Sequence, residues 1–272
     1  MTHSIKSSGK NNKLLYISDL HLELRPNLNY NKLLQQKAKY LVLAGDIGNP
    51  VIETNSYIKF LSAVSKSFKY VFYILGNHEY YNNQKITLPE MRDKIMNICS
   101  KFRNIYILDN DSYELEDENI IILGTTLWSM ADHIEASRCN DYQRIWIKSD
   151  DSVVNITTAD TTYWHQKNVD WLSSKIKDKN YIIISHYAPL LNSPGYYLSH
   201  PKYPMTSCFQ TDLTYLMNDN IKVWIYGHTH YNNDFIYSNI RICSNQVGYD
   251  DEKLLFSYSI HIDLDQLWID DI

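Results

Sequence analysis

Short apolar runs alternate along the chain with longer amphipathic stretches. Five runs rich in Val, Ile, Leu and Tyr are typical of strands that are buried on both faces: residues 14–18, 40–45, 70–76, 181–185 and 223–227. Between them, apolar residues recur at helical spacing in residues 52–66, 88–100 and 161–177. Strands that alternate with helices predict βαβ units with right-handed crossovers, and therefore an α/β fold.

Other segments fit this alternation less well. Residues 105–108 and 120–123 flank the polar stretch NDSYELEDEN, which favours a hairpin between them. The runs DFIYSNIRICSN and LLFSYSIHIDL are interpreted as further strands, antiparallel, in a second sheet. Residues 128–160 predict an inserted loop with short helices, and residues 190–208 a second long irregular connection. Loops of such length in a compact domain are more often functional than incidental.

The bulk composition is that of one globular domain. With 272 residues, 44% of them hydrophobic, the chain can form a single domain over residues 13–272, preceded by a flexible tail at residues 1–12. A net charge of -5 and a pI near 6.0 argue against a broad nucleic-acid-binding surface, although they leave room for a local basic pocket.

Cysteine usage and hydropathy predict the compartment. The four cysteines lie far apart and form no CxxC pair, so they are interpreted as reduced core thiols of an intracellular protein. The polar N-terminus lacks the apolar core of a secretory signal, and no apolar run approaches the ~20 residues that span a bilayer. We therefore expect a soluble cytoplasmic protein without a membrane partner; the oligomeric state is left open.

Metal-competent side chains follow each of the five predicted buried strands. In chain order they are Asp19 and His21, then Asp46, Asn77, His186, and finally His228 and His230. His78 and Glu79 follow Asn77 directly. Sites in open α/β sheets form at the carboxyl ends of strands, so these groups are expected to meet at one edge of the sheet. Each residue alone is more often a turn or cap residue, but the joint pattern favours a metal site.

The ordered set DxH, GD, GNHE, H and GHxH resembles the calcineurin-like metallophosphoesterase superfamily. The stretches GTTLWS (124–129), NDY (140–142), SHYAP (185–189) and WIYGHTH (224–230) are similar to a group of small, stand-alone bacterial-type metallophosphoesterases. The resemblance implies a four-layer sandwich, in which two packed mixed β-sheets are flanked by helices and a two-metal centre lies at one edge.

The resemblance also implies a role for each residue. Asp19, His21 and His230 would hold one metal, and Asn77, His186 and His228 the other. Asp46 would bridge both metals. His78 would be the catalytic residue that faces the substrate, whereas the alternative is a histidine that only orients a ligand.

The ligand types indicate the metal and the reaction. Mixed imidazole and carboxylate ligands suit Mn²⁺, Fe or Zn²⁺ better than Mg²⁺ or Ca²⁺, and Mn²⁺ is the ion expected first. Two divalent ions outweigh the charge of Asp19 and Asp46, so a phosphate group can bind favourably. In such centres a metal-bridged hydroxide attacks the ester, which predicts hydrolysis of a phosphodiester or phosphomonoester bond.

The motifs depart from those of protein serine/threonine phosphatases, which carry GDxxDRG and RGNHE. Here residues 45–51 read GDIGNPV and residues 74–79 read ILGNHE, so the acidic partner and both phosphate-gripping arginines are missing. Without a bidentate arginine clamp, phosphodiesters or small phosphorylated molecules are favoured over phosphoproteins. Arg138 or Arg144 could supply the charge.

Candidate substrate-pocket residues lie in the inserted loop. They are Trp128, Asn140, Tyr142 and Arg144. Ordinary aromatic packing is an equally good interpretation of Trp128 and Tyr142.

Two alternatives to such an enzyme remain. One is a catalytically silent binding module of the same fold, of which the retromer subunit is an example; the intact ligand set and His78 favour the enzyme. The other is a nuclease, for which the acidic charge balance gives no support.

Overall fold

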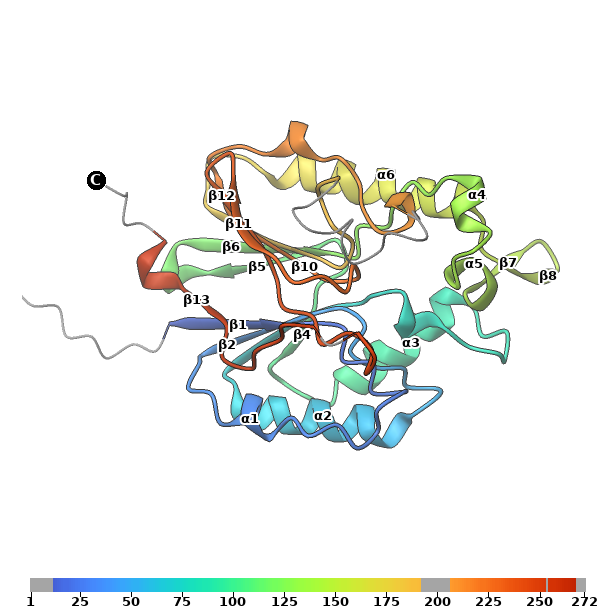
Figure 1. The fold of residues 1–272 in the computed structure, drawn as a ribbon, viewed down its shortest axis with the longest axis horizontal. Coiled ribbons are helices and arrows are strands. Elements are labelled where there is room, and N and C mark those ends of the chain that lie inside the picture. The colour runs from blue at the N-terminus through green and yellow to red at the C-terminus, as the bar shows by residue number, and fades with distance from the viewer. Residues whose placement is uncertain (1–11, 192–205, 253, 268–272) are drawn as a thin grey trace, which may run out of the picture.

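Two face-to-face β-sheets form the centre of the molecule, with helices on both outer faces (Figure 1). The computed structural model describes residues 12–191, 206–252 and 254–267. Beneath the first sheet lie α1 (Asn31–Leu34), α2 (Thr54–Ser67) and α3 (Leu88–Cys99), and above the second lies α6 (Thr158–Lys175). Short 3-10 helices are η1 (His78–Tyr80), η2 (Glu116–Glu118), η3 (Thr206–Cys208), η4 (Thr214–Leu216) and η5 (Leu264–Gln266).

The first sheet has the order β13-β1-β2-β3-β4. Its strands are β1 (Lys13–Ile17), β2 (Tyr40–Ala44), β3 (Tyr70–Ile74), β4 (Ile105–Ile107) and β13 (His261–Asp263). Strands β1 to β4 are parallel, with Leu15 paired with Leu41 and Leu41 with Val71, and β13 runs antiparallel to β1.

The second sheet has the order β11-β12-β10-β9-β6-β5. Its strands are β5 (Asp111–Leu115), β6 (Ile120–Thr125), β9 (Tyr181–Ser185), β10 (Ile221–Tyr226), β11 (Asp234–Tyr237) and β12 (Ile240–Ser244). The four inner strands are parallel, and the edge strands β5 and β11 are antiparallel to their neighbours.

Alternate side chains of the central strands belong to different layers of the core. Leu14 of β1 packs between the two sheets with Ile184 of β9, whereas Leu15 packs toward the helices below. On the far side of the second sheet, Ile183 packs with Leu172 of α6. Because both faces of these strands are covered, their sequences are continuously apolar rather than alternating.

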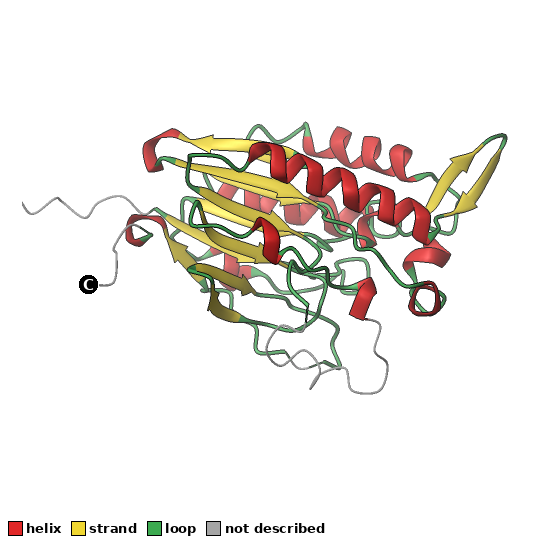
Figure 2. Ribbon diagram, turned by 90° about the horizontal axis from the view of Figure 1, so that it is seen from above, coloured by secondary structure: helices red, strands yellow, loops and turns green. Residues whose placement is uncertain are grey.

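The insertion forms its own small structure at the end of the molecule where β1 and its parallel neighbours terminate (Figures 1 and 2). It contains α4 (His133–Ala136), α5 (Asp141–Arg144) and the ribbon of β7 (Trp146–Ser149) and β8 (Ser152–Asn155). The long α6 that follows begins with a capping box, in which Thr157 and Asp160 satisfy each other's backbone N–H groups.

The structure confirms the predicted fold class, the five buried strands and the three long helices. The hairpin prediction was wrong in its first strand: Ile105–Ile107 joins the first sheet, and β6 pairs instead with β5, from within the polar stretch. At the C-terminus, β11 and β12 form the expected antiparallel pair in the second sheet, but only His261–Asp263 of the last run is a strand, and it joins the first sheet. Residues 1–11 of the predicted tail and residues 192–205 of the second long loop lie outside the described residues.

All four cysteines are buried and unpaired, in agreement with the prediction of core thiols. No helix in the described part of the chain is both long enough and apolar enough to cross a membrane.

Candidate metal centre

The predicted ligands come together where strands of both sheets end. β1, β2 and β3 deliver Asp19, Asp46 and Asn77 from the first sheet. β9 and β10 deliver His186 and His228 from the second. Strands of different sheets thus share one site, because their carboxyl ends point to the same end of the molecule.

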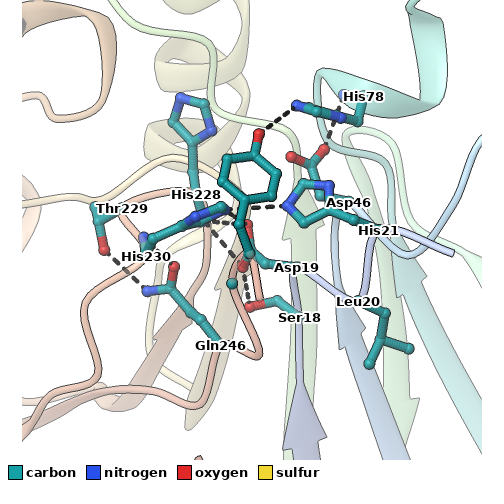
Figure 3. Close-up of polar contacts among 12 residues, drawn as sticks. Ser18, Asp19, Leu20, His21, Asp46, His78, His228, Thr229, His230 and Gln246 are labelled. Carbon is teal, nitrogen blue, oxygen red and sulfur yellow. Dashed lines mark hydrogen bonds and ion pairs between the residues drawn. The ribbon is translucent and has the colours of Figure 1, made fainter. Parts of the chain in front are cut away.

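Asp19, His21 and His230 form the first group, and all three are buried. The Nε2 atoms of His21 and His230 are 3.1 Å apart, and an oxygen of Asp19 lies 3.5 Å from Nε2 of His230 (Figure 3). Glu252 contacts Nδ1 of His230 at 2.6 Å. Because a carboxylate only accepts hydrogen bonds, Nδ1 carries a hydrogen, and Nε2 is the nitrogen that faces the site and is available to a metal.

Asp46, His186 and His228 form the second group, also buried, with Asn77 beside them. Nδ1 of His186 donates to the carbonyl of Ala44 at 2.9 Å, so its Nε2 faces the amide oxygen of Asn77, 2.9 Å away. Nε2 of His228 donates to the carbonyl of Cys208 at 3.2 Å, which leaves Nδ1 free. Every imidazole in the group therefore has one nitrogen committed to the protein and one available to a metal.

The amide of Asn77 is fixed in one orientation. Its Nδ2 donates to a carboxylate oxygen of Asp141 at 2.7 Å and to the hydroxyl of Tyr81 at 3.0 Å. Asp141 is itself buried and also accepts a hydrogen bond from the hydroxyl of Tyr187. The amide oxygen of Asn77, which is the atom that binds metals, is thereby turned toward His186.

These donor atoms fit divalent cations. Lone pairs of His186, Asn77 and Asp46 converge, as do those of His21 and His230, and such acceptors repel one another unless a proton or a cation lies among them. Asp19 and Glu252 raise the pKa of His230 to about 10, and Asp46 raises that of His186 to about 9, although burial alone would lower both pKa values. The pocket thus attracts positive charge, and nitrogens ~3 Å apart can bind one ion at bond lengths of roughly 2.1 Å.

Backbone conformation supports a functional site. Five of the seven predicted ligands have positive φ angles, between 47° and 67°: Asp19, His21, Asp46, His228 and His230. For residues other than Gly, this left-handed conformation costs on the order of 1 kcal/mol or more. The concentration of this conformation among the predicted ligands points to a constraint on where their side chains lie.

Glu79 ties two of the ligand loops together. Its buried carboxylate accepts hydrogen bonds from the backbone N–H groups of Asp46, Ile47 and Gly76, and from the hydroxyl of Tyr73 at 2.7 Å. Asp46 and Asn77 are thus held by one rigid network rather than by separate turns.

His78 lies beside both groups of proposed ligands and belongs to neither. Its backbone N–H donates to Asp46 at 2.8 Å, its Nδ1 lies 2.9 Å from a carboxylate oxygen of Glu23, and its Nε2 lies 3.2 Å from the hydroxyl of Tyr249. Burial would lower the pKa of His78, but the carboxylates of Asp46 and Glu23 outweigh burial and raise it.

A cavity of about 250 Å³ opens onto the centre. Asp46, Asn77, His78, His228 and His230 line it, together with Tyr81, Arg138, Cys139, Asn140, Asp141, Phe209, Thr229, Tyr249 and Glu252. Of the predicted substrate-pocket residues, only Asn140 lines this cavity. Trp128 packs against Tyr187 in the interior, the hydroxyl of Tyr142 contacts Thr161, and the guanidinium of Arg144 lies over the ring of Tyr81.

Sequence reasoning missed four residues of the site. Asp141 belongs to the NDY stretch, which could have signalled it. Glu23 lies two residues after His21, where an acidic residue is ordinarily on the surface. Tyr249 and Glu252 lie in a loop that comes after the last of the motifs along the chain, so no motif indicates them.

Comparisons with known proteins identify the family of this chain. A family model described as calcineurin-like phosphoesterase matches residues 13–232. Uncharacterized protein L509 of Acanthamoeba polyphaga mimivirus is 38% identical over 282 residues, which cover 95% of this chain and 99% of that protein. The molecule therefore has the fold and the class of a phosphoester hydrolase. The chain belongs to the calcineurin-like phosphoesterase family.

Solved structures share the architecture. The phosphopantetheinyl hydrolase PptH from Mycobacterium tuberculosis superposes with a TM-score of 0.68 at 19% identity, covering 88% of this chain and 90% of that one. TT1561 of Thermus thermophilus has a TM-score of 0.51 at 10% identity, covering 95% and 96%. At these identities the likeness establishes the fold alone.

Proposed function

We propose that the protein is a dinuclear metal-dependent phosphoesterase that hydrolyses phosphodiester or phosphomonoester bonds. The observation that carries the proposal is the convergence of two sets of lone pairs, one around His21 and His230 and one around His186 and Asn77, beside a single cavity that Asn77 and His230 line. Asp46, beside both sets, is the residue proposed to bridge the ions. Mn²⁺ is the ion proposed first, although Fe and Zn²⁺ also suit this donor set.

When bound, two divalent ions supply Lewis acidity that activates water and neutralises phosphoryl charge. The chain itself supplies orientation. Asp141 turns the amide oxygen of Asn77 inward, Glu252 turns Nε2 of His230 inward, and Glu79 holds the loops that carry Asp46 and Asn77. Ligands that are fixed in this way need little rearrangement during reaction.

His78 is proposed as the catalytic residue. Its Nε2 faces the cavity, where it contacts the Tyr249 hydroxyl. From there it can donate a hydrogen bond to a phosphoryl oxygen or a proton to the leaving oxygen, a step worth roughly 10²–10⁴ in rate.

The charge of the cavity favours diesters. Arg138 is the one guanidinium or ammonium side chain among the described residues that line it, and it lies at the exposed rim. A monoester dianion gains most from a bidentate arginine clamp, whereas a diester carries a single charge. We therefore propose a small phosphodiester as the preferred substrate.

The test is hydrolysis of mono- and diester panels by Mn²⁺-loaded protein. Bis(4-nitrophenyl) phosphate should be cleaved faster than 4-nitrophenyl phosphate. A phosphopantetheinyl-linked substrate belongs in the panel because a protein of the same fold is named for that activity. Absence of hydrolysis of any ester by metal-loaded protein would instead support a catalytically silent binding module.

A further inference from the structure

Glu23 is a buried acidic residue that the family's metal-ligand motifs do not include. Only 3% of its side chain is exposed. One carboxylate oxygen, Oε1, lies 2.9 Å from Nδ1 of His78 and 3.5 Å from Nδ1 of His21. Acidic side chains are rarely buried to this extent unless a partner compensates the charge. The two imidazoles, whose ring centroids are 4.4 Å apart, are the partners that the carboxylate contacts.

The contact determines which nitrogen of His78 bears a hydrogen. An ionised carboxylate only accepts hydrogen bonds, so Nδ1 of His78 is the donor to Glu23. Nε2 is then the nitrogen that faces the cavity, 3.2 Å from the hydroxyl of Tyr249. If Nδ1 carried the lone pair instead, it would face the carboxylate oxygen, and the two acceptors would repel each other.

The loop after Asp46 offers no competing acid. Asn49 donates through Nδ2 to the backbone carbonyls of His78 and Tyr81, at 2.6 and 2.7 Å, so it holds the main chain rather than the imidazole. Asp46 likewise contacts the backbone N–H of His78. Among the described residues, Glu23 is the carboxylate that lies within hydrogen-bond distance of the His78 ring.

We propose that Glu23 is the positioning residue of His78: its carboxylate accepts the Nδ1 hydrogen and directs Nε2 toward the substrate. The proposal rests on the proposed function, because it assigns a partner to the proposed catalytic histidine. The same oxygen lies 3.5 Å from Nδ1 of His21, a few tenths of an ångström beyond ordinary hydrogen-bond range. His21 belongs to the first group of proposed metal ligands. One carboxylate thus lies between a proposed metal ligand and the proposed catalytic residue.

The test compares Glu23→Gln with Glu118→Gln in full-length protein loaded with Mn²⁺. Glutamine keeps the size of Glu23, but its amide can donate as well as accept and so permits the opposite tautomer of His78. Glu118 is the matched control. Its carboxylate is also buried and accepts hydrogen bonds from Lys39 and Tyr40, but Glu118 does not line the cavity at the proposed metal centre.

We expect Glu23→Gln to keep the metal content of the wild type and its KM, and to lose roughly 10- to 100-fold in kcat on bis(4-nitrophenyl) phosphate, the range for groups that orient a functional histidine. Glu118→Gln should keep wild-type kcat. Wild-type kcat in Glu23→Gln overturns the proposal. Loss of a metal ion in proportion to activity also overturns it, because Glu23 would then be a ligand alongside His21 and His78.

A second measurement depends neither on activity nor on whether Glu23→Gln folds. Long-range ¹H–¹⁵N correlation spectra of the metal-free wild-type protein, assigned with His78→Gln, should place a hydrogen on Nδ1 of His78. A neutral His78 with its hydrogen on Nε2 refutes the proposal. If Nδ1 carries the hydrogen but the wild type hydrolyses no phosphoester, the proposed function fails and the orientation of His78 by Glu23 stands.

Discussion

Gly76 lies directly against Asp46 and His186 of the second group, and its replacement by alanine tests the arrangement of the site without removing a proposed ligand. A Cβ atom at residue 76 would lie 2.2 Å from a carboxylate oxygen of Asp46 and 2.7 Å from Nε2 of His186. The Cβ atom would also lie 2.7 Å from the backbone nitrogen of Asp46. Because Gly76 does not have a positive φ angle, the effect of alanine comes from these contacts with Asp46 and His186.

The size of the effect follows from the overlap. Asp46 must move by about 1 Å to restore an ordinary van der Waals contact, and a misplacement of that size can cost ~10²-fold in rate. We therefore expect Gly76→Ala to lose most of the ion that is proposed to bind at Asp46 and His186, and at least ~10²-fold in turnover. The cost in stability should be about 1–3 kcal/mol, as for other overpacked interiors.

Gly124→Ala is the matched control. Its Cβ would lie 2.3 Å from Leu108 and 2.5 Å from Ile74, a clash of similar severity against apolar side chains between the sheets. Metal analysis by mass spectrometry, turnover of bis(4-nitrophenyl) phosphate and melting temperature should be measured for both variants. We expect the two variants to be destabilised equally and only Gly76→Ala to lose metal. Full metal content and activity in Gly76→Ala would refute the placement of Asp46 and His186 in one metal centre.

Three further perturbations have defined outcomes. Asp46→Asn should lower the content of both ions, measured as metal per chain, because Asp46 is the proposed bridge; full occupancy would contradict that role. His78→Ala should retain both ions and lose roughly 10²-fold or more in kcat. That loss in kcat should be smaller for substrates with nitrophenolate leaving groups if His78 protonates the leaving oxygen. If His78→Ala instead loses metal but keeps its turnover per bound metal pair, His78 is a metal ligand. A chelator should abolish hydrolysis but leave the circular dichroism spectrum unchanged, because the cores on both sides of each sheet do not depend on the site; unfolding on chelation would indicate a structural metal.

The sequence was most informative where burial was complete. Residues 40–44 and 181–185 are apolar almost throughout because helices and a second sheet cover both their faces, so their strand pattern was unambiguous. Strand β5 was missed because Asp111–Leu115 is an edge strand with four of its five residues exposed or half-exposed, and such a strand resembles a polar link. The pairing of His261–Asp263 with β1 joins opposite ends of the chain, which no local pattern encodes.

That the seven proposed ligands lie together could be predicted because each member follows a strong strand signal. The groups that orient the ligands could not. Glu252 reaches His230 from a loop, and Glu23 lies beside the Nδ1 atoms of two imidazoles, contacts that depend on the tertiary fold. Trp128 illustrates the converse, because a residue beside a motif proved to pack in the interior against Trp164 and Tyr187.

Our central proposal is that seven side chains from both sheets form one centre for two ions. The most direct measurement is the metal-to-protein ratio of Mn²⁺-reconstituted protein after removal of free metal, determined by mass spectrometry. We expect about two ions per chain, as in other two-metal phosphoesterase sites. A ratio of one or less under saturating metal would contradict the proposal.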